Sequence, residues 1–69
     1  MELHWEDDFT INVRIEEGGA VVVSANEAGL RSLATHLQAL AEEEAGSHIH
    51  YDEGNSLEEG SAELIVEKI

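Results

Sequence analysis

The amino-acid sequence predicts a small α+β fold in which one helix packs against one face of a mostly antiparallel sheet. Three observations lead to this prediction. Residues 9–15 alternate apolar and polar side chains, as a half-buried strand does. Residues 30–41 place apolar side chains three and four positions apart, as an amphipathic helix does. Strand-like runs at 20–24, 47–51 and 61–67 then give the order β-β-α-β-β.

Residues 9–24 are expected to form a β-hairpin. Gly18 and Gly19 separate its two strand-like runs, and glycine readily takes the positive φ angles that tight hairpin turns require. The odd-numbered residues of the first run are all apolar and share the face that turns toward the core. Residues 3–5, ahead of the acidic residues 6–8, either add a short strand or lead into the hairpin.

The helix is expected to begin near position 24 and to end at about Ala45. Ser24 with Glu27 fits a capping box, and Asn26 is the alternative N-cap, which starts the helix two residues later. Gly46 suits the position after the last turn. One apolar stripe along the helix is expected to pack on the sheet. Its members are Leu30, Leu33, Ala34, Leu37, Leu40 and Ala41.

Residues 47–51 and 61–67 are expected to complete the sheet. Ile49 and Tyr51 face inward from the first of these strands, and alternate apolar residues face inward from the second. Residues 52–60 form a polar connection between them. The sheet face opposite the helix is left uncovered. Its side chains are Thr10, Asn12, Arg14, Val22, His48, His50, Glu63 and Ile65.

The charge balance limits the kind of partner. The 69 residues carry 16 acidic and three basic side chains, a formal net charge of −13. Three cations cannot form the basic patch that nucleic-acid binding requires, and the same charge disfavours anionic membranes. An acidic surface attracts a basic protein partner and accelerates its association. The alternative is that the acidity serves solubility alone.

Composition argues against several other classes. No cysteine is present for disulfides or thiolate–zinc sites. No signal-peptide pattern or bilayer-length apolar run occurs, so we expect a cytoplasmic protein with one domain over residues 1–69. No glycine-rich phosphate loop precedes the helix, and one helix on one sheet leaves little room for a catalytic pocket. We therefore expect neither an enzyme nor a cofactor.

A run of alternating polar residues in the third strand raises a separate question. His48, His50 and Asp52 project from one side of a strand. Two such histidines with an aspartate are suitable ligands for a metal ion. The alternative is that they face solvent and that the histidines pair with Glu63 and Glu67 across the sheet. We favour the second interpretation because three ligands rarely come from one strand.

The second half of the chain resembles a known family. The motifs are Gly29-Leu30…Leu33-Ala34…Leu37 in the helix, Gly46-Ser47-His48-Ile49-His50 in the third strand, and Leu57-Glu58-Glu59-Gly60-Ser61 with Glu63-Leu64-Ile65-Val66 at the end. In this order they resemble immunity protein family 32 over roughly residues 20–69. The members of that family are predicted antidotes in bacterial polymorphic toxin systems. The resemblance implies a non-enzymatic protein that neutralises a toxin, and it supplies no catalytic residues.

A basic partner, such as a cognate toxin, is expected to contact the acidic connection and the uncovered sheet face. The predicted partner-binding residues are Arg14, His48, His50, Asp52, Glu53, Glu58 and Glu59. The helix end at Glu42–Glu44 is an alternative contact. Two other functions stay open. One is a structural homodimer through the sheet face, which would cover Val22 and Ile65, and the other is a small metal-binding protein that uses the third-strand histidines and Asp52.

Overall fold

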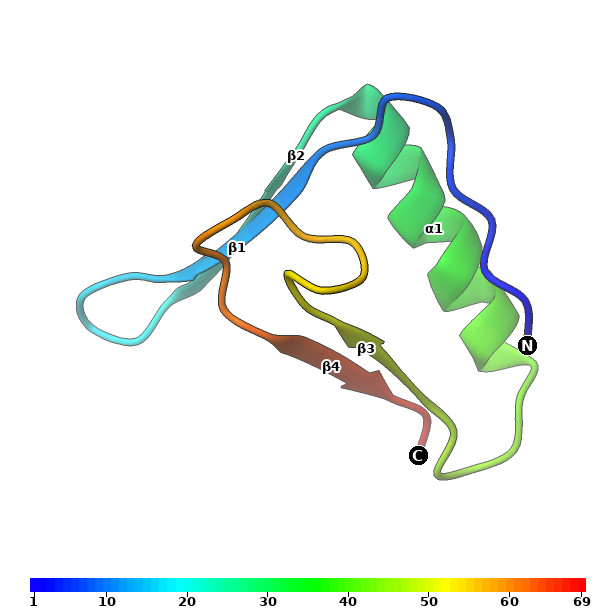
Figure 1. Ribbon diagram of the computed structural model, residues 1–69. Coiled ribbons are helices and arrows are strands. Elements are labelled where there is room, and N and C mark those ends of the chain that lie inside the picture. The colour runs from blue at the N-terminus through cyan, green and yellow to red at the C-terminus, as the bar shows by residue number, and fades with distance from the viewer.

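The computed structural model describes residues 1–69 and confirms the α+β class and the order β-β-α-β-β (Figure 1). The elements are β1 (Ile11–Ile15), β2 (Val21–Ala25), α1 (Glu27–Ala41), β3 (His48–Tyr51) and β4 (Leu64–Glu67). The helix runs along one side of the molecule, and the β1–β2 hairpin projects from the other (Figure 1). No helix combines the length and the apolar character that are needed to span a membrane.

The strands form two separate two-stranded antiparallel sheets, β1–β2 and β3–β4, rather than one continuous sheet. The connection between β3 and β4 explains the separation, because it occupies the outer edge of β1. The Glu58 N–H donates to the Ile11 carbonyl oxygen at 2.9 Å, and the Ala62 N–H donates to the Val13 carbonyl oxygen at 2.7 Å. The Ser61 hydroxyl oxygen accepts from the Val13 N–H at 3.1 Å. An irregular segment thus satisfies the backbone groups that a third strand would otherwise bind.

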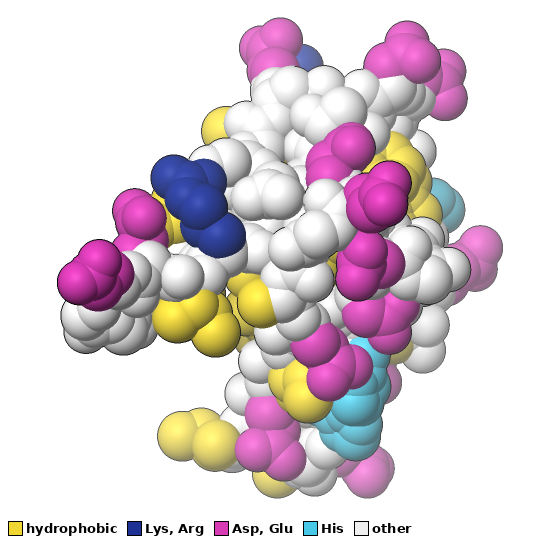
Figure 2. All heavy atoms as spheres, turned by 60° about the vertical axis from the view of Figure 1, so that its left-hand side comes forward, with side chains coloured by type: hydrophobic (Ala, Val, Ile, Leu, Met, Phe, Trp, Pro, Cys, Tyr) yellow, Lys and Arg dark blue, Asp and Glu magenta, His cyan; other side chains and the backbone are white.

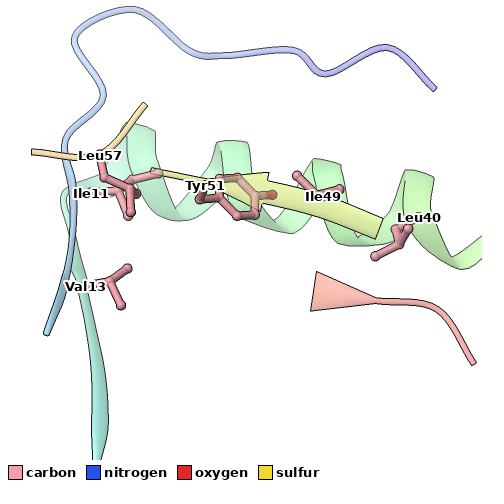
Figure 3. Close-up of a cluster of buried hydrophobic side chains, with 6 residues drawn as sticks. All are labelled: Ile11, Val13, Leu40, Ile49, Tyr51 and Leu57. Carbon is pink, nitrogen blue, oxygen red and sulfur yellow. The ribbon is translucent and has the colours of Figure 1, made fainter. Parts of the chain in front are cut away.

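Six apolar side chains form the buried core. Figure 3 shows Tyr51 at its centre, with Ile11 and Leu57 at one end and Ile49 and Leu40 at the other. Ile49 and Tyr51 confirm the predicted inward face of β3, and Leu64 and Val66 pack against the core as expected for β4. The core therefore joins both hairpins, the connection and the helix.

The N-terminal segment, residues 1–9, passes along α1 as an ordered strap without regular secondary structure (Figure 1). The Glu6 N–H donates to the Ser32 hydroxyl oxygen at 2.9 Å. The Trp5 ring stacks on Phe9, and its edge meets the His36 ring, both with centroids 4.4 Å apart. The segment forms no strand. It leads into β1, as the alternative expectation had it, and it also covers the polar side of the helix.

His36 and Tyr51 form a buried hydrogen-bonded pair beneath this strap. His36 Nε2 lies 2.6 Å from the His4 carbonyl oxygen, an acceptor, so Nε2 carries a proton and donates. His36 Nδ1 lies 2.9 Å from the Tyr51 hydroxyl and accepts from it. Burial raises the pKa of Tyr51 to about 12, so the hydroxyl keeps the proton that it donates. The pair thus ties the strap, the helix and β3 together.

The helix begins at one of the two predicted N-caps but ends earlier than predicted. Asn26, the alternative, is the N-cap: its Oδ1 accepts from the Gly29 N–H at 2.8 Å and from the Thr10 N–H at 3.0 Å. The helix ends at Ala41 rather than near Ala45, so Gly46 does not terminate it. Lys68 Nζ donates to the Ala41 carbonyl oxygen at 2.6 Å, which gives the last turn the cation that its dipole favours.

The predicted apolar stripe of α1 is only partly buried. Leu40 is buried and Leu33 is half-buried, whereas Leu30 and Leu37 are 55% and 46% exposed. The reason is the N-terminal strap, which packs on the side of Ser32 and His36 and draws that polar side into the interior. The opposite, apolar side of the helix is left at the surface.

Gly29→Ala is expected to destabilise the protein, although the same change in an open helix stabilises it by about 1 kcal/mol. A Cβ at this position would lie 2.5 Å from the Thr10 carbonyl oxygen and 3.0 Å from Ile11 Cγ1. Because the helix must then move away from β1, we expect a loss of roughly 1–3 kcal/mol in urea unfolding. The exposed Gln38→Ala is the control, and equal stability of the two variants would contradict this packing.

Candidate partner-binding surface

Acidic side chains gather on the outer face of β3 and β4 and on the connection between them. We call this surface the acidic face and define it as Glu53, Glu58, Glu59, Glu63 and Glu67 together with the neighbouring His48 and His50, all of them exposed. Figure 2 shows a band of Asp and Glu side chains that runs down this side of the molecule and ends beside histidine side chains. Five of the seven predicted partner-binding residues are therefore exposed on β3 and on the connection that follows it.

The two histidines lie side by side on β3, with ring centroids 4.9 Å apart. His50 Nδ1 lies 3.4 Å from Glu63 Oε2, so the expected cross-strand His–Glu pair is present. His48 lies opposite Glu67 in the register of β3 and β4, and its Nδ1 is 3.0 Å from the Gly46 carbonyl oxygen. Because these side chains are about half exposed, solvent weakens their pairing. Their rings and carboxylates remain accessible to a partner.

Asp52 does not join the histidines. Its Oδ1 turns into the connection and accepts from the Gly54 N–H at 2.8 Å and the Asn55 N–H at 3.1 Å. No group of three or more His, Asp or Glu side chains is placed to hold a metal ion, so the alternative interpretation, in which Asp52 and the two histidines are metal ligands, is wrong. Asp52 instead shapes the turn that begins the connection.

Glu53 also contributes to the shape of the connection, whereas two later glutamates do not. Glu53 Oε2 accepts from the Gly60 N–H at 2.9 Å and closes the connection into a loop. Leu57 is buried beneath it. Glu58 and Glu59 follow Leu57, and both are exposed to solvent. These two carboxylates are therefore the free charges of the loop.

Arg14 is separate from the acidic face. It lies on β1, where its Nη1 donates to the Ser24 hydroxyl oxygen at 2.9 Å and its Nε lies 4.0 Å from Glu16 Oε2. Both partners belong to its own hairpin, which projects from the rest of the molecule (Figure 1). The predicted uncovered sheet face is split between two sheets, and Arg14 belongs to the other one.

Sequence reasoning missed an apolar groove on another side of the molecule. The groove has a volume of about 380 Å³ and lies between α1 and the strands. Its lining is wholly apolar and consists of Val23, Leu30, Leu33, Ala34, Leu37, Tyr51, Leu64 and Val66. The exposed leucines of α1 form one wall. The signal was present in the apolar stripe of the helix, but the periodicity does not show which part of a stripe stays uncovered.

The family comparison agrees with the resemblance noted in the sequence. Residues 20–69, most of the chain, match the family described as Immunity protein 32. The chain belongs to this family. No curated protein and no solved structure matches it.

The part of this Immunity protein 32 member that matches the family includes β2, α1, β3 and β4. It therefore contains the whole acidic face and every residue that lines the apolar groove. The strap and β1 lie outside the match, although they supply the buried Ile11 and Val13 and the strap residue Trp5. Both candidate surfaces thus belong to the part that identifies the family.

Asp52→Ala is expected to destabilise this Immunity protein 32 member by about 1 kcal/mol, because two backbone N–H groups lose their acceptor. Urea unfolding followed by circular dichroism measures the loss. Glu59→Ala, an exposed site on the same connection, is the control and is expected to change stability by less than about 0.5 kcal/mol. Equal losses of stability in the two variants would contradict the structural role of Asp52.

Proposed function

We propose that this Immunity protein 32 member neutralises a cognate protein toxin by binding it without catalysis and covering a basic surface with its acidic face. The family match over residues 20–69 is the observation that carries the proposal. The net charge of −13 and the exposed carboxylates of the acidic face support a basic partner. An occluding protein of this kind needs a stable, charged surface rather than a reactive group.

The charges of the acidic face are available to a partner because the chain has few cations to neutralise them. Its two arginines and single lysine are already engaged: Arg14 with its own hairpin, Arg31 with Glu27 at 2.6 Å, and Lys68 with the end of α1. Glu58, Glu59 and Glu67 have no cationic neighbour within ion-pair distance. Their field extends about one Debye length, roughly 8 Å at physiological salt, and steers a basic partner toward this face.

A growth-protection assay tests the proposal. The protein encoded beside this chain's gene is expressed in a bacterial host with and without the chain. We expect growth to stop without the chain and to recover with it. The control is Ile49→Asp, which places a charge in the core and is expected to unfold the protein. A neighbour that is toxic in both cases would refute the proposal for that pair, and protection by the unfolded control would refute a folded binding surface.

A further inference from the structure

The apolar groove is exposed in a way that the fold itself does not require. Val23, Leu30 and Leu37 line it and are 39%, 55% and 46% exposed. The apolar surface continues onto the hairpin, because Ile15 pairs with Val21 on the same face as Val23, and both are exposed. Figure 2 shows hydrophobic side chains at the surface on the flank of the projecting hairpin. A contiguous exposed apolar patch of this kind marks an interaction site.

The arrangement of the helix reinforces this interpretation. The strap covers the side of α1 that carries Ser32 and His36, and it satisfies their polar atoms with hydrogen bonds. The leucines of the opposite side have no such cover. So small a chain buries only about 60% of its unfolded surface, and leucines that stay exposed do not contribute the free energy that their burial would add. A bound partner that covers them would add that free energy.

Charge identifies the occupant. Glutamates lie beside the groove walls: Glu27 is one turn before Leu30, and Glu16 follows Ile15 on the hairpin, each with one arginine within 4.0 Å. A second copy of the chain would bring another net charge of −13 against these carboxylates. A positively charged segment with an apolar face meets both the lining and its acidic surroundings.

We propose that the apolar groove receives the apolar face of a basic amphipathic segment of the partner protein. This inference rests on the proposed function, since it names the part of the partner that the chain holds. The volume of about 380 Å³ is within the range of roughly 300–1,000 Å³ that binding pockets span, so it suits a few side chains. A helix that presents residues at i, i+3, i+4 and i+7 is the form that such grooves accept. The acidic face then steers the partner while the groove anchors it.

A peptide titration followed by nuclear magnetic resonance tests the groove without any toxin. The probe is an amphipathic peptide of about 14 leucine and lysine residues, with the leucines on one helical face. The control peptide has the same composition with its leucines spread around the helix. The ¹⁵N-labelled chain is expected to show amide shifts at Val23, Leu30, Leu37 and Val66 with the first peptide and weaker binding of the second.

The variants separate apolar anchoring from charge attraction. The double variant Leu30→Gln with Leu37→Gln is expected to lower the affinity for the first peptide by roughly tenfold or more, because the peptide no longer buries two half-exposed leucine side chains. Ile65→Gln is the matched control, since Ile65 is 52% exposed but does not line the groove, and it is expected to leave binding unchanged. Circular dichroism shows whether each variant is folded. If a variant does not fold, the amide shifts of the unaltered chain with the two peptides still test the proposal.

Several results would overturn the proposal. Shifts confined to the acidic face, or equal binding of both peptides, would show attraction by charge alone. Absence of binding would also refute it. If sedimentation shows self-association that Leu37→Gln abolishes, the groove binds a second copy of the chain. If hexanol causes amide shifts and neither peptide does, the groove binds a small apolar ligand. Growth protection that survives the leucine variants would keep the proposed function and remove only the groove.

Discussion

Tyr51→Ala is expected to unfold most of the protein at room temperature. Tyr51 is 1% exposed and lies at the centre of the core (Figure 3). It meets Trp5 edge-on with ring centroids 6.1 Å apart and donates to His36 Nδ1. Truncation of a buried aromatic side chain costs about 3–5 kcal/mol, and a core of this size supplies only about 3–5 kcal/mol of net stability. Urea unfolding followed by Trp5 fluorescence and circular dichroism measures the effect.

Two further variants separate the ring from its hydroxyl. Tyr51→Phe keeps the ring but leaves His36 Nδ1 without its donor, so a loss of about 1–3 kcal/mol is expected. His50→Ala, on the exposed side of the same strand, is expected to change stability by less than about 0.5 kcal/mol. A Tyr51→Ala variant as stable as the unaltered chain would show that the two hairpins do not share a core through this residue.

Reversal of two charges on the acidic face is expected to slow association with the proposed toxin partner by about tenfold at low salt. The variant is Glu58→Lys with Glu59→Lys, whose side chains are exposed and hold no part of the fold together. The slower rate follows from weaker electrostatic attraction of the basic partner. The difference should therefore shrink at high salt, where the Debye length falls to a few Å. Stopped-flow association rates at several salt concentrations measure it.

Glu42→Lys with Glu44→Lys is the matched control, because it changes the net charge equally at the exposed end of α1. It is expected to leave the association rate nearly unchanged, and the added cations also suit the helix dipole. If this variant slows association and the first does not, the partner binds the helix end instead. Equal effects of both would show that net charge matters and that the acidic face does not.

The local elements could be predicted from the sequence because they follow short-range rules. Alternation in residues 9–15 and 61–67 identified strands and their inward faces, and the glycines at 18 and 19 identified the hairpin turn, where both have a φ of 94°. For the start of the helix, the sequence left two candidate N-cap residues, Ser24 and Asn26. Asn26 prevails over Ser24 because its side chain also binds the backbone of the preceding segment, at Thr10 and Asp8.

The tertiary arrangement could not be predicted in the same way. The N-terminal strap has no periodicity, and its place on α1 depends on two hydrogen bonds that no local pattern indicates: the Glu6 N–H donates to the Ser32 hydroxyl oxygen, and His36 Nε2 donates to the His4 carbonyl oxygen. The apolar stripe of α1 suggested that its leucines were buried, whereas the strap competes for the helix and leaves Leu30 and Leu37 outside. The split of the sheet likewise depends on contacts between β1 and residues 58–62.

The candidate site was predicted in part. The alternation of polar and apolar residues in β3 correctly predicted that His48 and His50 lie on its exposed face. It was also correctly expected that Glu63 pairs with His50 across the strands. Asp52 was expected on the same side as the histidines, and it differs because a side chain that follows a strand is free to turn back to its own backbone, as this one does. Arg14 shares a predicted face with the histidines only if the sheet is continuous, and here it is not.

The most direct test of the central proposal is the stoichiometry of inhibition. Purified chain is titrated into a fixed amount of the cognate toxin, well above their dissociation constant, and the remaining toxin activity is measured. A protein that acts by occlusion predicts a linear fall in activity that ends at a fixed molar ratio and does not deepen with time. Inactivation by far less than one equivalent, or inhibition that grows with incubation, would indicate catalysis and contradict the proposal.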